Sequence, residues 1–260
     1  MTALAHLLAT ACYAAALLVG VLWRRDTPPP VPALLGAGVL VHASSFVVLH
    51  FEPAPLPLDS FAAALSLIGW LTPVSYLVAL RFARVREVAS WVAGLAALLT
   101  ACASLGIELA TPPVPTGPLG TWSHAHVLLS TLGFSMLALA SLAGLAYLAK
   151  ERALKSKRRS RFPLPSLESL DRMEHLTLSL GFSLLTLGVL TGFVWAVSQG
   201  LSPWTKHSSW LVAAWVVYLL PIGVRVVNRQ HGERPARLVV LGFAFLAFSY
   251  LGIRLAGLSA

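Results

Sequence analysis

The sequence predicts an all-α fold: one polytopic membrane bundle of eight transmembrane helices over residues 1–260, with both termini outside the cytoplasm. Composition is the first indication, because the chain is 57% hydrophobic and 11% charged, whereas a soluble domain is about 25% charged. Long apolar stretches recur from end to end, each near the about 20 residues that a helix needs to cross a bilayer. Seventeen of the nineteen Lys and Arg residues then fall on one side of the alternating pattern, which marks that side as cytoplasmic.

Four apolar segments fill the first half of the chain, near residues 3–22, 32–51, 60–80 and 88–109. The first has no basic leader before it, so we interpret it as a span rather than a removed signal peptide. The run Pro28–Pro30 cannot continue a helix and separates the first two segments. The connection at 51–60 carries acids and no base, which predicts an external turn, whereas 81–87 is short, basic and therefore internal.

Four further segments follow, near residues 124–149, 172–199, 208–227 and 238–257. The connection at 110–121 contains no Lys or Arg, while 150–161 is the largest basic block. These two connections are therefore predicted to lie outside and inside, respectively. Ser166, followed by Ser169 and Asp171, predicts that the sixth helix begins in the cytosol before it enters the membrane.

The charge and the cysteines exclude several function classes. A net charge of +9 could indicate a nucleic-acid partner, but the basic residues lie in connections and no RNA- or DNA-binding motif occurs. The charge is expected to fix orientation and to contact anionic lipid of the bilayer. Cys12 and Cys102 form no CxxC or CxxCH motif, which excludes a thiol oxidoreductase and a c-type cytochrome. No catalytic set is evident, so the sequence favours a binding, transport or regulatory protein over an enzyme.

Two of the eight histidines stand out by their depth in the predicted spans. His42 lies about eleven residues into the second span, about 16 Å from its inner end. A polar ring at mid-bilayer is a functional hypothesis by default; the alternative is a neutral ring bonded to a carbonyl of a neighbouring helix. His124 and His126 differ by about 200° around one helix, so only one can face the bundle. The residues that follow His126 are the more apolar, so the His126 ring is the one expected to face the bundle.

Several rings converge on the predicted external face. His50 and His207 join the pair that begins the fifth span, and Trp122 and Trp204 mark the same interface. Neutral imidazole commonly ligates iron, and two rings across a flat apolar slot suit haem. No HxxxH, HExxH or HxxE pattern indicates zinc. Spacing alone therefore leaves two interpretations open, a haem site and chance clustering.

Two histidines lie at the opposite, internal side. His175 is near the inner end of the sixth span, between Arg172 and a neighbouring acid. Its ring is expected to be solvated or interfacial, with a ligand role as the alternative. His231 lies in a basic internal turn and is expected to be solvated.

The stretch Leu164–Ala196 carries the most specific pattern, LPSLESLDRMEHLTLSLGFSLLTLGVLTGFVWA. It resembles the cytochrome c assembly (CcsA/CcmC-type) membrane family, in which an LPxLxxLD segment leads into a helix with GFxLLTxGxxTGxxWA. Trp210–Tyr218 is similar to that family's W(x)4WxxY, and Leu241–Phe245 to its late LGF segment. The external WDPKE loop is replaced by the short SPWTKH of residues 202–207, and the late external His is absent. With these two differences, the chain is more similar to the eight-span HemX/YpjD-like branch of the family.

The resemblance implies haem handling through histidines, in a bacterial cytoplasmic (inner) membrane. His42 matches the family's early transmembrane ligand, and His126 matches its first external ligand. The family's seventh-span His would fall near Gly223, so that ligand is absent from this chain. His207 is the expected substitute partner, so haem b iron is assigned to these three histidines. The full predicted cofactor-binding set is His126, His42, His207, His124, His175, His50, Trp122 and Trp204.

Three functions follow as hypotheses. The first is a haem-binding protein involved in haem handling or transport for cytochrome c assembly or tetrapyrrole-synthesis control. The second is a component of a haem lyase that acts with a cytochrome c assembly subunit. The third is a membrane regulator that docks glutamyl-tRNA reductase on the basic loop 150–161, a role implied by the HemX-type resemblance. No internal repeat supports a small-molecule transporter.

Overall fold

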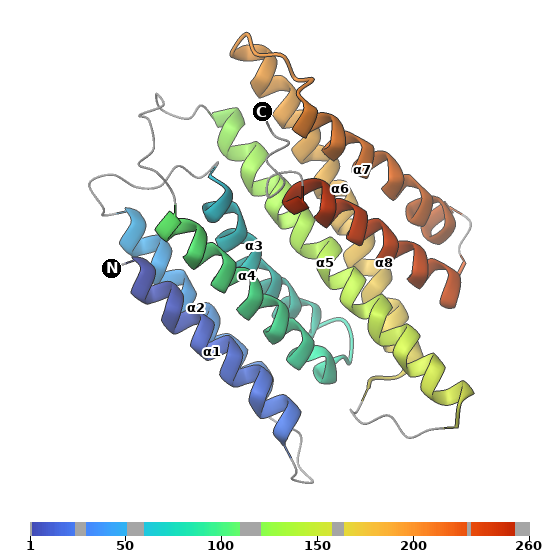
Figure 1. Cartoon of the computed structure of the whole chain (residues 1–260). Coiled ribbons are helices and arrows are strands. Elements are labelled where there is room, and N and C mark those ends of the chain that lie inside the picture. Colours follow the sequence, from blue (N-terminus) through green and yellow to red (C-terminus); the bar gives the residue numbers. More distant parts are fainter. Residues whose placement is uncertain are drawn as a thin grey trace. The chain divides into compact units, whose positions relative to one another are not determined.

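The computed structural model describes residues 2–23, 30–50, 60–109, 121–157, 164–227 and 230–252. Over these ranges the chain is helical and contains no strand (Figure 1), which confirms the predicted all-α class. The α-helices are α1 Thr2–Leu22, α2 Val31–His50, α3 Phe61–Ala79, α4 Ala89–Leu109, α5 Thr121–Lys155, α6 Leu167–Ser198, α7 Lys206–Ile222 and α8 Glu233–Ala247. Three short segments complete them, the 3-10 turn η1 Arg86–Val88 and the π segments η2 Gly223–Val227 and η3 Phe248–Gly252.

Six of these helices are long and apolar enough to cross a membrane, namely α1, α3, α4, α5, α6 and α7. Helix α2 is apolar but shorter in its described part. Each of the eight predicted segments is helical over its described residues, while eight crossings with both termini outside stay a prediction. Ser166 accepts a hydrogen bond from the Ser169 backbone N–H, which confirms the predicted start of the sixth helix.

The chain divides into two compact units, of which unit 1 contains α1 to α4. Helix α1 packs against α2 and α4, and α3 packs mainly against α4 (Figure 1). The ring of Tyr13 in α1 lies so close to Gly38 in α2 that a Cβ there would be 2.6 Å from the ring. The Trp70 indole of α3 donates to the Val39 carbonyl of α2 over 3.0 Å. Unit 1 is thus held by small residues and a few directed polar contacts, as membrane helix pairs generally are.

Unit 2 contains α5 to α8 and is organised by the contact between α5 and α6. At Gly133 of α5, an added Cβ would lie 2.6 Å from the Leu185 backbone nitrogen of α6. At Gly181 of α6, it would lie 2.9 Å from the Met136 Cβ of α5. The glycines of the α6 sequence motif therefore serve close backbone approach, which small residues permit between membrane helices.

Helices α7 and α8 complete unit 2. The Trp215 indole of α7 donates to the Thr186 hydroxyl of α6 over 2.9 Å and stacks on Phe182, with 5.9 Å between ring centroids. Helix α8 packs against α5 and α7. Pro221 lies near the end of α7, and the backbone then widens into the π segment η2. A proline and a π segment together are a common source of a local change in helix direction.

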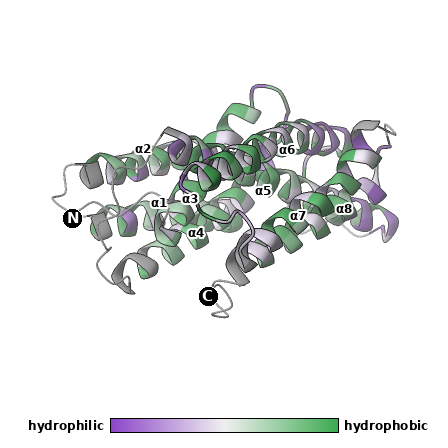
Figure 2. Ribbon diagram, turned by 90° about the horizontal axis from the view of Figure 1, so that it is seen from above, coloured by the Kyte–Doolittle hydropathy of each residue, from purple (hydrophilic) through white to green (hydrophobic). Residues whose placement is uncertain are grey.

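The outer faces of the helices are apolar. Leu40 of α2 is 74% exposed and Leu241 of α8 is 66% exposed, which suits contact with lipid rather than water. Figure 2 shows hydrophobic residues along the helices, and hydrophilic residues gathered where α8 begins. That hydrophilic end of unit 2 carries some of the basic residues on which the predicted orientation rests, among them Lys155, Arg225 and Arg237.

The α5–α6 contact leads to a stability prediction. Because the Leu185 backbone cannot yield, we expect Gly133→Ala to lower the free energy of unfolding by about 1–3 kcal/mol, measured by denaturant unfolding in detergent. Gly223→Ala is the matched control, since a Cβ there meets nothing within 4 Å. Equal stability of the two variants would contradict the close approach.

Candidate functional site

His126 lies in α5 and its ring faces α6. Its Nδ1 is 2.7 Å from the Gly188 carbonyl oxygen. Because a carbonyl oxygen only accepts, the hydrogen of the neutral ring must be on Nδ1. The Nε2 lone pair is then available to bind a metal.

Two glycines of α6 make room for this ring. A Cβ at Gly192 would lie 2.5 Å from His126 Nδ1 and 2.7 Å from Cε1. One turn earlier, Gly188 supplies the carbonyl, which also accepts a hydrogen bond from the Thr191 hydroxyl over 3.0 Å. The spacing of Gly188 and Gly192 therefore fixes both the position and the tautomer of His126.

The arrangement at His126 fits a haem-iron ligand. Metal-ligating histidines usually donate their second ring N–H to a carbonyl or carboxylate, and Gly188 provides that acceptor. Trp122, one turn before His126, is 50% exposed and offers apolar surface of the kind that a porphyrin needs. His124 is exposed, in agreement with the expectation that only one of the two rings faces a neighbouring helix.

His42 lies in unit 1 and is wholly buried. Its Nε2 is 3.0 Å from the Ser66 hydroxyl oxygen and its Nδ1 is 3.5 Å from the Tyr13 hydroxyl oxygen. The ring also stacks on Phe46, with 5.5 Å between ring centroids. Both ring nitrogens are thus engaged with hydroxyls from α3 and α1, so iron ligation by His42 requires one of these contacts to be exchanged.

His6 is the neighbour of His42 that the sequence analysis did not single out. Its Nε2 is 2.8 Å from the same Ser66 hydroxyl oxygen, and the two imidazole centroids are 5.3 Å apart. A signal was available, because His6, Ala9, Tyr13 and Ala16 recur on one helical face and are all buried. We refer to His6, Tyr13, His42 and Ser66 as the histidine cluster.

The remaining predicted residues do not join these two sites in the described structure. His50 and His207 lie in helix ends, and their side chains fall outside the described part. Trp204 is exposed near the start of α7, and His175 is exposed near the start of α6. Ligand roles for these residues stay predictions.

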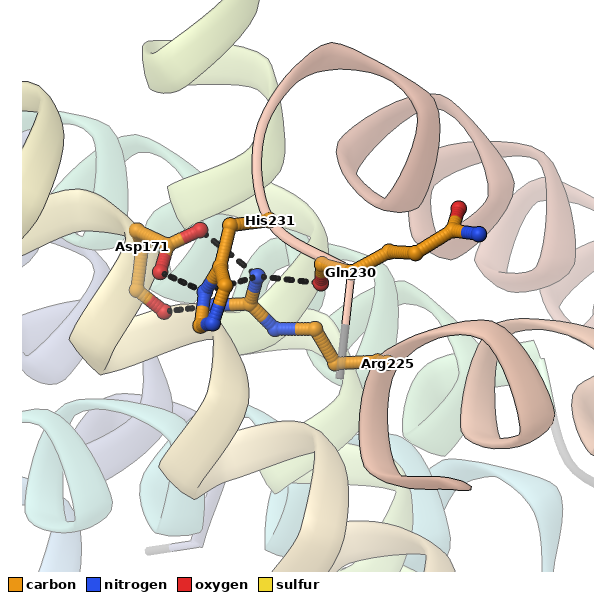
Figure 3. A network of polar contacts seen from close by, with 4 residues as sticks. All are labelled: Asp171, Arg225, Gln230 and His231. Atoms are coloured by element: carbon orange, nitrogen blue, oxygen red, sulfur yellow. Dashed lines mark hydrogen bonds and ion pairs between the residues drawn. The ribbon is translucent and has the colours of Figure 1, made fainter. Parts of the chain in front are cut away.

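A buried ion-pair network lies at the hydrophilic end of unit 2 (Figure 3). Arg225 of η2 reaches the start of α6, where its guanidinium is 2.7 Å from the Asp171 carboxylate and also 2.7 Å from the Asp171 backbone oxygen. It donates to the Gln230 carbonyl over 3.1 Å. The Arg225 side chain is 1% exposed and that of Asp171 is 20% exposed, so this pair is largely removed from water.

His231 completes the network from the solvent side. Its Nδ1 is 2.9 Å from the second Asp171 carboxylate oxygen and 3.2 Å from Arg225 Nη1. The ring was expected to be solvated; it is largely exposed but bonded to Asp171. Glu174, one turn further into α6, is buried beside Gly144 of α5. The π segment places Arg225 for these contacts, and a count of basic residues per connection could not have predicted that placement.

A second, exposed ion-pair group joins the end of α5 to the start of α8. Lys155 is 3.0 Å from both Glu151 and Glu233, and Arg237 also pairs with Glu233. The hydrogen bond from Lys155 holds the pKa of the Glu233 carboxyl below its ordinary value. Of the predicted basic block, residues 150–157 belong to this region, and 158–161 lie outside the described residues.

Comparison with known proteins gives a family match. The family described as "Cytochrome C assembly protein" matches residues 37–259. This range includes His42, His126 and the whole Leu164–Ala196 motif.

Several curated relatives are named "Cytochrome c biogenesis protein CcsA". The one from Chlamydomonas reinhardtii is 26% identical over 86% of this chain and 65% of its own length. The one from Guillardia theta is 30% identical over 58% of this chain and 56% of its own. The one from Parasynechococcus marenigrum is 25% identical over 88% of this chain and 84% of its own. The chain thus spans about two thirds or less of the length of the two algal relatives, and most of the cyanobacterial one.

The buried network leads to a second stability prediction. Removing one partner of a buried pair leaves the other charge uncompensated, so Arg225→Met should lower the free energy of unfolding by about 3–5 kcal/mol. Asp171→Asn in the same chain should recover part of that loss. Arg237→Met, which removes an exposed pair, should change the denaturation midpoint little. Equal effects of the two arginine substitutions would contradict a buried Arg225.

Proposed function

The chain belongs to the cytochrome c assembly protein family, and from this membership we propose that it is a multi-pass haem-binding protein of cytochrome c assembly, with iron ligated by His126. The observation that carries the proposal is the hydrogen bond between His126 Nδ1 and the Gly188 carbonyl. It presents Nε2 as the ligand atom, and it is built from the glycines of the motif that carries the family resemblance.

The protein's own residues would bind and orient the cofactor. Haem b supplies an iron centre that accepts imidazole nitrogen. Gly188 holds the His126 tautomer, Gly192 gives the ring its space, and the apolar surface at Trp122 excludes water. We propose His207, near the start of α7, as the second ligand, with Trp204 beside it in sequence. His42 is the proposed second or transit site, entered by exchange of its contact with Ser66.

A haem-lyase role depends on a partner in this proposal. The CcsA relatives are named for cytochrome c biogenesis, and the chain matches only part of the length of two of them. Its external segment 202–207 is short, so apocytochrome docking would require an assembly subunit. The positive-inside pattern supports an orientation with both termini outside, and the family resemblance is the basis for proposing a bacterial inner membrane.

A regulatory role rests on a different surface. The last turn of α5 extends basic side chains, Arg152 and Lys155, at the hydrophilic end of unit 2. This surface supports docking of a soluble enzyme such as glutamyl-tRNA reductase on the loop 150–161. Replacement of Lys150, Arg152 and Lys157 by Glu should abolish co-purification of added reductase while membrane insertion is retained. Unchanged co-purification would contradict docking on this loop.

The haem proposal is tested by optical spectra of the detergent-purified protein offered hemin. We expect a Soret band and a b-type pyridine haemochrome, with His126→Ala abolishing or broadening the band. Gly192→Ala should alter the band while the imidazole is retained, because the new methyl group displaces the ring. His231→Ala, which removes an imidazole at the opposite end of unit 2, is the control and should leave the band unchanged. Colourless wild-type protein, or an unaltered band in His126→Ala, would overturn the assignment.

A further inference from the structure

Helix α7 is held against α6 by an aromatic anchor formed by Trp215, Phe182 and Thr186. The Trp215 indole N–H donates to the Thr186 hydroxyl oxygen over 2.9 Å, and its ring stacks on Phe182 with 12° between the ring planes. The Thr186 hydroxyl in turn donates to the Phe182 carbonyl over 2.8 Å. Among the described residues, this is the one hydrogen bond between side chains of α6 and α7. A directed bond and a stacked pair together fix both the height and the rotation of α7 on α6.

The same stretch of α6 holds His126 on another face. Phe182 and Thr186 are four residues apart and share one face of the helix, while Gly188 and Gly192, which meet the His126 ring, share another. From Thr186 to Gly188 the helix turns by about 200° and rises by about 3 Å. Helix α6 is therefore a common support that sets α5 and α7 at defined heights relative to each other.

The ion pair at the hydrophilic end of unit 2 cannot replace this anchor. Arg225 follows Trp215 in the chain and pairs with Asp171, which precedes Thr186, so α6 and α7 run antiparallel. Pro221 and the π segment η2 lie between the two contacts, and helix direction commonly changes at such features. The ion pair therefore holds the segment after Pro221, whereas the anchor holds the part of α7 before it.

The anchor thus determines where the beginning of α7 lies. His207 comes eight residues before Trp215, which is about 12 Å along α7. The α6 residues that meet His126 come two and six residues after Thr186, about 3–9 Å along α6. Because the helices are antiparallel, both histidine positions lie on the same side of the anchor and at similar heights. A slip of one helical turn, about 5.4 Å, would separate them.

From this geometry we propose that Trp215 and Thr186 are positioning residues of the haem site, which hold α7 at the height that lets His207 meet the iron bound to His126. The inference rests on the proposed function, since it takes His126 and His207 as the ligand pair. Trp215 and Thr186 act through the register of α7 and not by contact with the porphyrin. Axial ligation sets the electronic state of haem iron, so loss of register should leave His126 as the one protein ligand.

The inference is tested first by electron paramagnetic resonance of the purified protein loaded with hemin. We expect a low-spin ferric signal in the wild type, as two imidazole ligands give. In Thr186→Val the ratio of low-spin to high-spin haem should fall about fivefold, the factor that corresponds to one hydrogen bond of ordinary strength. Trp215→Leu, which also removes the stacked ring, should lower the ratio further. Thr186→Ser keeps the hydroxyl and should retain the wild-type ratio.

Thr177→Val is the matched control for Thr186→Val. Thr177 is a buried threonine of the same helix, and its hydroxyl donates to the carbonyls of Met173 and Glu174 within α6. This substitution should leave the spin-state ratio unchanged. The midpoints of thermal unfolding of the two valine variants should agree closely, which separates a change of register from a general loss of stability.

A second measurement, on haem-free protein, tests the register itself. Cys12 and Cys102 are replaced by alanine, and spin labels are attached at Leu128→Cys of α5 and Val216→Cys of α7, two exposed positions. The distance between the labels is measured by double electron–electron resonance. We expect one narrow distribution in this parent, the same distribution after Thr186→Ser, and a shifted or broadened one after Thr186→Val.

Two results would refute the role of Trp215 and Thr186 alone. The first is a low-spin signal that His207→Ala abolishes but that Thr186→Val and Trp215→Leu both retain. The second is a distance distribution that Thr186→Val leaves unchanged. A low-spin signal that survives in His207→Ala, or wild-type protein that binds no hemin, would instead refute the proposed ligand pair and this role with it. The failure of the inference and the failure of the proposed function therefore give different patterns.

Discussion

The close approach of α5 and α6 is the constraint on which the rest of unit 2 depends. Gly133 and Gly181 let the two backbones come together, and about one helical turn of α6 beyond the Leu185 contact, the Gly188 carbonyl and the space at Gly192 meet the His126 ring. A larger residue at Gly133 or Gly181 would separate the two helices, whereas one at Gly192 would meet the His126 ring directly. The position of His126, the first proposed ligand, is therefore a product of helix packing.

The polar contacts within the described residues are of two kinds. Within the apolar spans the partners are neutral, as in the histidine cluster and the threonines bonded to their own helix, because an isolated charge in that setting is very unfavourable. Full charges appear where the helices end, and there Arg225 is matched by Asp171 and by carbonyl oxygens. The cytoplasmic placement of this end of unit 2 stays a prediction.

Sequence patterns predicted the helices well because an apolar run of about 20 residues is a strong signal; the segment near 3–22 is α1 at Thr2–Leu22. Helical geometry also predicted that only one of His124 and His126 faces the bundle, and the more apolar residues after His126 favoured that ring. The pairing of His6 with His42 could not be predicted in this way, since it depends on which helices are neighbours. The sequence indicated only that Arg225 is one of the basic residues on the predicted cytoplasmic side. Its contacts depend on the π segment η2, which no periodic pattern in the sequence predicts.

The Gly188 carbonyl lies inside α6, where it accepts the helical N–H four residues on as well as the His126 ring. A descendant of this chain with another side chain in place of His126 would still have that oxygen satisfied by its own helix. The stability of the helix bundle therefore depends little on the His126 ring. Gene duplication could accordingly yield copies that fold normally and have lost the ligand, so in this architecture a new role can evolve without a compensating change in the bundle.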